Sequence, residues 1–206
     1  MLNKSLYLLP LLSLASIEAN ADSNIVYEMS HIGFGYKHAN LDAGATEPYL
    51  NGMYSNDVDK AYGGLYLDLG LGLTDALFLE GNASFVTRFS SEIDHWQAGA
   101  GFNVPVSSLV ALPLSCGAIN YRADSDYSSS YSERALYCKA GARAQVAKHW
   151  LIDTSYQHAF LDVAKDTYRL NNVFQFGSVF GFTLGMEYAQ RKKSETALTV
   201  GLQFTL

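Results

Sequence analysis

Leucine occupies every second position from Leu65 to Leu73, with polar or small residues between. After a short stretch at 74–76 the alternation resumes and continues to Phe89. Successive side chains of a β-strand point to opposite faces, so strict alternation over this length indicates strands with one apolar face. Two strands joined by three residues form a hairpin. The range 61–89 is therefore predicted to be a β-hairpin.

The same alternation recurs along the rest of the chain. It predicts ten strands, at 25–39, 61–73, 77–89, 95–104, 109–121, 134–146, 150–160, 169–176, 180–188 and 194–206. No stretch reads as an amphipathic helix of useful length. The sequence thus favours an all-β fold, an antiparallel up-and-down transmembrane β-barrel of ten strands.

The connections between these strands alternate in length. The longer ones are predicted at 40–60, 90–94, 122–133, 161–168 and 189–193. Outer-membrane barrels have long external loops and short periplasmic turns. With the N-terminus in the periplasm, every longer connection lies outside. An eight-stranded alternative would need 170–190 as one long strand and the first strand left out, and would put 122–133 in the periplasm, so ten strands are preferred.

The N-terminal region resembles an export signal. Lys4 precedes an apolar run over 6–14, and Ala19-Asn20-Ala21 forms a small-residue cleavage site. This combination predicts a signal peptide at 1–21, removed before Asp22. The apolar run is too short to cross a bilayer as a helix. The barrel is therefore expected at 22–206, in the outer membrane of a Gram-negative cell.

A soluble barrel with its apolar face inside would also alternate. Two features favour the membrane. Charged residues make up 17% of the chain, against roughly 25% in soluble domains, and the polar face is rich in Gly, Ser, Asn and Gln. Aromatic residues also gather at the predicted interface heights, as membrane barrels require. They are Trp150, Phe174, Phe176, Phe180 and Phe182 near the periplasmic turns, and Tyr36, Phe89, Trp96, Phe160 and Tyr188 near the external loops.

The signal peptide, the alternating strands and the terminal sequence at 201–206 together resemble the small outer-membrane barrels of the OmpA/OmpX type. The segment Ile152-Asp153-Thr154-Ser155-Tyr156-Gln157-His158 is similar to a strand motif of that group. The chain departs from the group in continuing past Phe204 with Thr205-Leu206, and in its ten predicted strands rather than eight. The resemblance implies insertion by the barrel-assembly machinery.

The expected partners follow from location and charge. The lipid bilayer and lipopolysaccharide would surround the wall, and a monomer is expected. The net charge of −6 gives no basic footprint, so nucleic-acid binding is not expected. The histidines are scattered without metal-ligand spacing, and no nucleotide-binding or nucleophile motif occurs. No cofactor, metal site or catalytic residue is predicted.

Six charged residues fall on the predicted inner face: Asp68, Glu80, Lys139, Arg143, Asp153 and Glu187. With a turn at 147–149, Arg143 lies directly opposite Asp153. Charges in a low-dielectric lumen must be paired to be tolerated. A network that plugs the lumen is the favoured interpretation, and a narrow gated pore is the alternative.

Cys116 and Cys138 face lipid on neighbouring predicted strands. An even pair in an exported chain predicts a disulfide, which would stabilise the fold by roughly 3 kcal/mol. The same pairing puts His158 beside Cys138. The lipid A deacylase family uses an outward histidine with a serine two residues on, but that position is Phe160 here. No carboxylate is expected at a height that orients His158, so an enzyme is not favoured.

The predicted loop at 122–133 and its flanks hold Tyr121, Tyr127 and Tyr131 among serines. Tyrosine and serine suit adaptable contact surfaces. This loop and 40–60 are the candidates for contact with a surface ligand. We expect a barrel with a filled lumen whose external loops act in envelope integrity or surface adhesion. The alternatives are a lipid A-modifying enzyme and a narrow small-solute channel.

Overall fold

The structure is a computed structural model that describes residues 29–50, 60–126 and 128–206. The predicted signal peptide, the start of the first predicted strand and Tyr127 lie outside the described residues. Among the described residues, no helix is long and apolar enough to cross a membrane.

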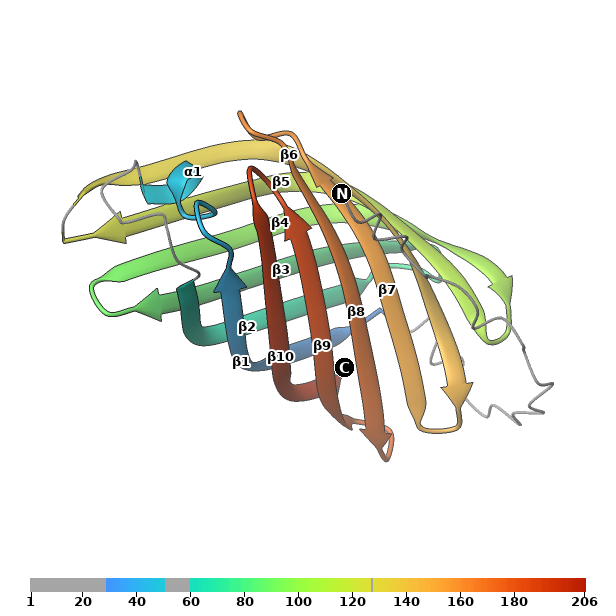
Figure 1. Ribbon diagram of the computed structural model, residues 1–206. Coiled ribbons are helices and arrows are strands. Elements are labelled where there is room, and N and C mark those ends of the chain that lie inside the picture. Colours follow the sequence, from blue (N-terminus) through green and yellow to red (C-terminus); the bar gives the residue numbers. More distant parts are fainter. Residues whose placement is uncertain (1–28, 51–59, 127) are drawn as a thin grey trace, which may run out of the picture.

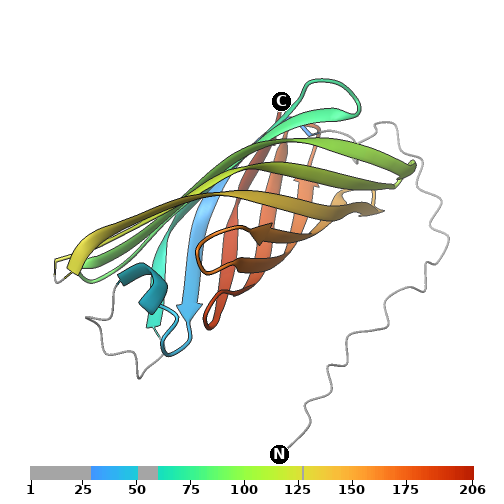
Figure 2. The ribbon, with the colours of Figure 1, turned by 90° about the horizontal axis from the view of Figure 1, so that it is seen from above.

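Ten antiparallel strands form a closed barrel, in which each strand pairs with its neighbours in sequence and β1 pairs with β10 (Figures 1 and 2). The predicted fold class and the preference for ten strands are confirmed. The strands are β1 (His31–Leu41), β2 (Lys60–Gly72), β3 (Leu77–Arg88), β4 (Ser91–Ser107), β5 (Val110–Ser125), β6 (Ser128–Ala147), β7 (Trp150–Ala159), β8 (Lys165–Phe176), β9 (Phe180–Gln190) and β10 (Ser194–Thr205). A short helix, α1 (Glu47–Leu50), lies between β1 and β2.

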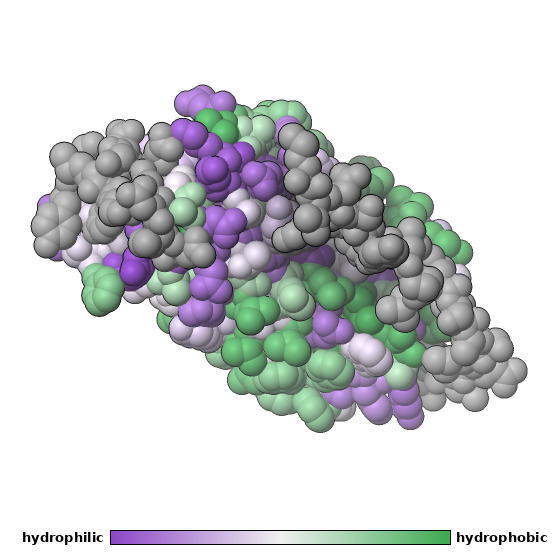
Figure 3. Space-filling view, in the orientation of Figure 1, coloured by the Kyte–Doolittle hydropathy of each residue, from purple (hydrophilic) through white to green (hydrophobic). Residues whose placement is uncertain are grey.

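The alternation of the sequence becomes the two faces of the wall. On β2, Leu65 is 64% exposed and Leu71 is 47% exposed, although both are large and apolar. Their neighbours point inward, and Tyr66 crosses the lumen to reach Thr183 on β9 at 2.7 Å. The barrel is therefore apolar outside and polar inside, the reverse of a soluble barrel. Figure 3 shows a band of apolar surface with hydrophilic residues on both sides of it.

Aromatic side chains meet on the outer face at both ends of the wall. Trp150 and Phe174 stack at 5.8 Å near the turns that join β6 to β7 and β8 to β9. Toward the opposite rim, Tyr168 contacts Tyr156 at 5.1 Å and Tyr188 at 6.4 Å. These contacts give the two aromatic belts that bracket the apolar band of a membrane barrel.

Two of the predicted external loops are wrong for most of their length. The pairing of β5 with β6 continues through Arg122 opposite Ser132, so 122–133 belongs mainly to a long hairpin with a tight turn. Likewise, β4 begins at Ser91, within the predicted loop 90–94. Polar residues on both faces predict a loop. Past the apolar band, however, the outer face of a strand meets water and the inner face holds buried polar or small residues such as Ser91 and Ala123, so the strand continues without an apolar alternation. Strand β6 accordingly extends past the end of β7, because the pairing of the two strands stops at Tyr137 opposite Ala159 (Figure 1).

Candidate functional site

All six sequence-predicted lumen charges lie inside the barrel, and each has a partner there. The predicted cross-strand pair forms between Arg143 and Asp153, which are directly opposed, with Nη2 to Oδ2 at 2.8 Å. Glu80 forms an ion pair with Lys139. Its carboxylate also accepts hydrogen bonds from Ser115 at 2.7 Å and Tyr137 at 2.8 Å.

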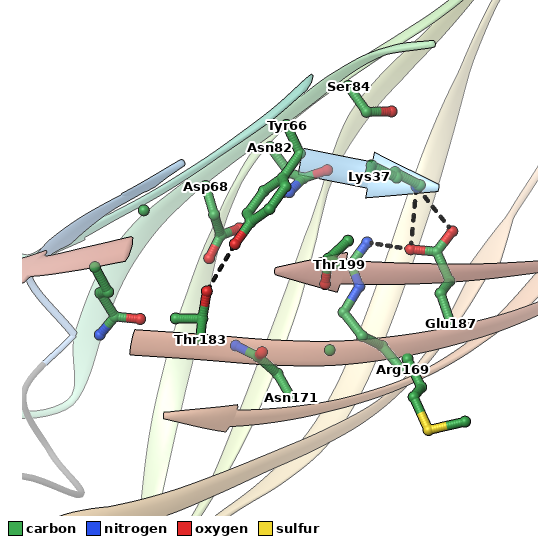
Figure 4. A pocket seen from close by; sticks show the side chains of 14 residues that line it. Lys37, Tyr66, Asp68, Asn82, Ser84, Arg169, Asn171, Thr183, Glu187 and Thr199 are labelled. Atoms are coloured by element: carbon green, nitrogen blue, oxygen red, sulfur yellow. Dashed lines mark hydrogen bonds and ion pairs between the residues drawn. The ribbon is translucent and has the colours of Figure 1, made fainter. Parts of the chain in front are cut away.

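The remaining two predicted charges have partners that the sequence reasoning did not name. Asp68 lies 3.0 Å from His31 Nε2, and Asn82 donates to its other oxygen at 3.1 Å. Glu187 lies between two cations, Lys37 at 3.3 Å and Arg169 at 3.1 Å (Figure 4). Lys37 on β1 and Arg169 on β8 occupy alternate positions whose side chains face the lumen, so the alternation of the sequence could have identified them.

Within the described part of the barrel, cavities of about 50, 90 and 50 Å³ lie between these clusters. Lys37, Ser84 and Glu187 border both the outer and the middle cavity, and Asp68 and Arg169 border both the middle and the inner one. A water molecule takes roughly 30 Å³ of liquid volume. Each of these cavities is large enough to hold at least one ordered water molecule.

At the external end, Tyr49 of α1 fills the mouth of the lumen and is 1% exposed. Its hydroxyl donates to Glu195 Oε1 at 2.9 Å and accepts from Lys165 Nζ at 3.0 Å. Its ring lies 5.7 Å from that of Tyr121, and the Arg191 guanidinium lies 4.8 Å from the ring centre. Burial, and then the nearby Glu195 carboxylate, raise the pKa of the Tyr49 phenol, so the hydroxyl keeps its proton and serves as the donor. Sequence reasoning missed this residue because nothing in the loop pattern predicts that its side chain turns inward.

Of the three tyrosines proposed as loop contacts, the two that the structure describes, Tyr121 and Tyr131, do not form an exposed surface. Tyr121 lies within β5, is 6% exposed and stacks on His95 at 4.8 Å, so it is not available to a soluble partner. Tyr131 lies on the inner side of β6, where its hydroxyl contacts Glu133 and accepts from Arg191 at 3.1 Å. Tyr127 is outside the described residues. Both side chains occupy inward positions: Tyr121 near the end of a predicted strand, and Tyr131 on a part of β6 that was expected to be loop.

On the outer face, Cys116 and Cys138 are directly opposed on β5 and β6 and form a disulfide. His158 lies opposite Cys138, as the pairing arithmetic predicted. The expectation that no carboxylate would orient this histidine is wrong, because Asp166 Oδ1 lies 2.7 Å from His158 Nδ1. Tyr156 donates to the same oxygen at 2.6 Å. Asp166 was assigned to a loop, but β8 begins at Lys165 and brings it beside β7.

The closed barrel, its apolar outer wall and its charged interior define a small transmembrane β-barrel, the class that the sequence resembles. No protein-family model matches the chain, and no curated protein matches it.

Several solved structures resemble the fold. Ail, the attachment invasion locus protein of Yersinia pestis, has 16% identity and a TM-score of 0.44, over 86% of this chain and 97% of that one. Neisserial surface protein A has 11% identity and a TM-score of 0.44, over 85% and 96%. The KdgM porin has 9% identity and a TM-score of 0.43, over 84% and 99%. The strand order and register of the chain itself, rather than these likenesses, establish its fold.

Proposed function

We propose that this chain is an integral outer-membrane protein with a closed lumen, whose projecting external strands act in surface adhesion or envelope integrity. The apolar wall between two aromatic belts supports membrane insertion. The predicted signal peptide at 1–21 and the C-terminal strand support export and assembly in the outer membrane. Lipopolysaccharide would then surround the external half of the wall.

A closed lumen is supported by the ion pairs that bridge it at successive levels. Lys37, Arg169 and Glu187 join β1, β8 and β9, and the Lys139–Glu80 pair joins β6 to β3. The small volumes of the cavities between these pairs, about 50 to 90 Å³, also support a lumen filled by side chains. Steady single-channel conductance of the purified protein in planar bilayers would contradict a closed lumen and favour the small-solute channel.

The observation that carries the proposal is the projection of the β5–β6 hairpin. The register of β6 with β7 begins at Tyr137, opposite Ala159, so the β6 residues ahead of it lie beyond the end of β7. Such a strand edge presents backbone donors and acceptors to which an extended segment of another protein can pair. A surface partner that adds a strand at this edge would need no pocket in the barrel.

The experiment shortens the hairpin without disturbing the wall. Residues 123–131 are replaced by Asn-Gly, so that the pair Arg122–Ser132 closes a two-residue turn. The matched control replaces the turn 74–76 at the opposite rim. We expect at least tenfold fewer bacteria adhering to a monolayer of cultured animal cells, or a comparable gain in detergent sensitivity. Folding is checked by the heat-dependent gel mobility of the barrel. A shortened protein that folds and leaves both readouts unchanged would contradict the proposal.

A second candidate, a lipid A-modifying enzyme, is favoured by the His158–Asp166 pair. A histidine oriented by a carboxylate can act as a general base, and these two residues face the outer leaflet near the external rim. Mass spectrometry of lipid A, with the wild type and with H158A expressed, tests this candidate. A changed acyl pattern that H158A abolishes would support it, and an unchanged spectrum with the protein present would remove it.

A further inference from the structure

Tyr49 differs from most of the lumen residues described above because it does not belong to a strand. The partners described above for Glu80, Asp68 and Glu187 all lie on strands or immediately before one, whereas Tyr49 belongs to the four-residue helix α1. Its side chain nevertheless reaches the interior and is almost completely buried. The strands therefore provide a pocket, and a residue from outside the sheet fills it.

The pocket contacts both the hydroxyl group and the ring of the Tyr49 phenol. The Tyr49 hydroxyl accepts a hydrogen bond from Lys165 and donates one to Glu195, so it is paired both as an acceptor and as a donor. Tyr121 and the Arg191 guanidinium lie near the ring, where aromatic and cationic groups interact favourably with a π system. A ring without a hydroxyl would leave Lys165 and Glu195 without this partner.

The groups that hold the phenol are fixed independently of α1. Lys165 and Glu195 form an ion pair at 2.5 Å. Arg191 pairs with Glu133, and its Nε donates to the Val163 carbonyl at 3.1 Å. Withdrawal of Tyr49 would leave these contacts in place, so the pocket is preformed by β8, β10 and the turn between β9 and β10.

The pocket also has capacity that Tyr49 does not use. Within the described part of the chain, Arg191 Nη1 is buried without a hydrogen-bond partner. A cavity of about 50 Å³ adjoins Tyr49 on the lumen side, bordered by His95, Tyr121 and Glu187. An occupant with a second acceptor or a larger substituent could use this donor and this space.

We propose that the external mouth of the barrel is a binding site for a small phenolic compound, and that Tyr49 occupies this site as a tethered competitor. The proposal is independent of adhesion, because the site needs no partner protein. Tyr49 is held close to the pocket by the chain, so a free phenol must compete with a high effective concentration. Removal of the Tyr49 side chain should therefore expose the affinity of the site.

The experiment measures binding of 4-methylphenol, the side chain of tyrosine in free form, to Y49A in detergent micelles by calorimetry. The heat measured with the wild type is the reference, and subtracting it removes the contribution of probe that partitions into the micelles. Toluene is the matched probe without a hydroxyl. Y137A is the matched control variant, because Tyr137 is also a fully buried tyrosine, and its hydroxyl donates to Glu80, a carboxylate paired with a lysine.

We expect saturable binding of one 4-methylphenol to Y49A, at least tenfold tighter than to the wild type or to Y137A. Toluene should bind Y49A at least tenfold more weakly, since a site built to bind a hydroxyl rejects an analogue that lacks it. Equal binding to Y49A and wild type, or equal binding of the two probes, would overturn the proposal. Heat-dependent gel mobility verifies folding, and Y49S replaces Y49A if the alanine variant does not form a barrel.

Discussion

Two charged clusters in the lumen differ in the origin of their members. In the middle of the barrel, Lys37, Arg169 and Glu187 all come from strands. At the mouth, Lys165 and Glu195 come from strands but their shared partner Tyr49 comes from α1. The register of the sheet fixes the first cluster completely, whereas the second can lose one member without breaking a strand pair. The middle cluster is therefore suited to stability and the mouth cluster to exchange.

Replacement of Glu187 should produce the largest effect. E187Q removes the anion between Lys37 and Arg169 and leaves two cations facing one another in the lumen. Loss of one partner of a buried ion pair costs about 3–5 kcal/mol. We expect the free energy of unfolding, measured by urea titration in micelles, to fall by that amount.

A double variant tests whether the loss arises from the unpaired charge. K37M combined with E187Q removes one of the two remaining cations, so it should recover part of the stability. A loss below about 1 kcal/mol in E187Q would contradict the view that the register holds this cluster as a closed unit.

The mouth should respond more weakly to a comparable change. Y49F removes one hydroxyl, but Lys165 and Glu195 remain paired with each other at 2.5 Å. The expected loss is that of one hydrogen-bonded group, about 1–2 kcal/mol, in the same urea titration. A loss as large as that of E187Q would remove the distinction between the two clusters.

The smallest expected effect is a dependence on alkaline pH. The pKa of Tyr49 in the folded barrel is raised by burial, and in the unfolded chain it returns to about 10. A group with a raised folded pKa stabilises the protein fully below its unfolded pKa and loses that contribution as pH rises above it. The stability difference between wild type and Y49F should therefore shrink by about 1 kcal/mol between pH 8 and pH 11. A difference that stays constant across this interval would show that the phenol is not buried.

The alternation of the sequence was sufficient to predict much of the interior. Parity places Asp68, Glu80 and Glu187 inside, and counting across the turn at 147–149 predicts that Arg143 opposes Asp153. Both predictions depend only on the period of a strand and the closure of a hairpin, which are local properties. The disulfide between Cys116 and Cys138 follows from the same counting.

Features at the external rim could not be predicted in this way. The His158–Asp166 pair was missed because the end of a strand was inferred from the end of its alternation. Above the apolar band, the outward positions of a strand are polar and the inward positions are mostly polar or small, so the hydrophobic period disappears while the hydrogen-bonded ladder continues. The inward position of Tyr49 depends on contacts between segments far apart in the chain, which no local pattern encodes.

The closure of the barrel also determines how the protein could be engineered. Because His31 is paired with Thr205, the sheet begins and ends at the same rim, and the turn near Asp126 lies at the opposite rim. A reporter fused after Leu206 and an epitope inserted at that turn would therefore emerge on different sides of one membrane. The barrel could therefore serve as a compact display scaffold, with the epitope on one side of the membrane and the reporter on the other.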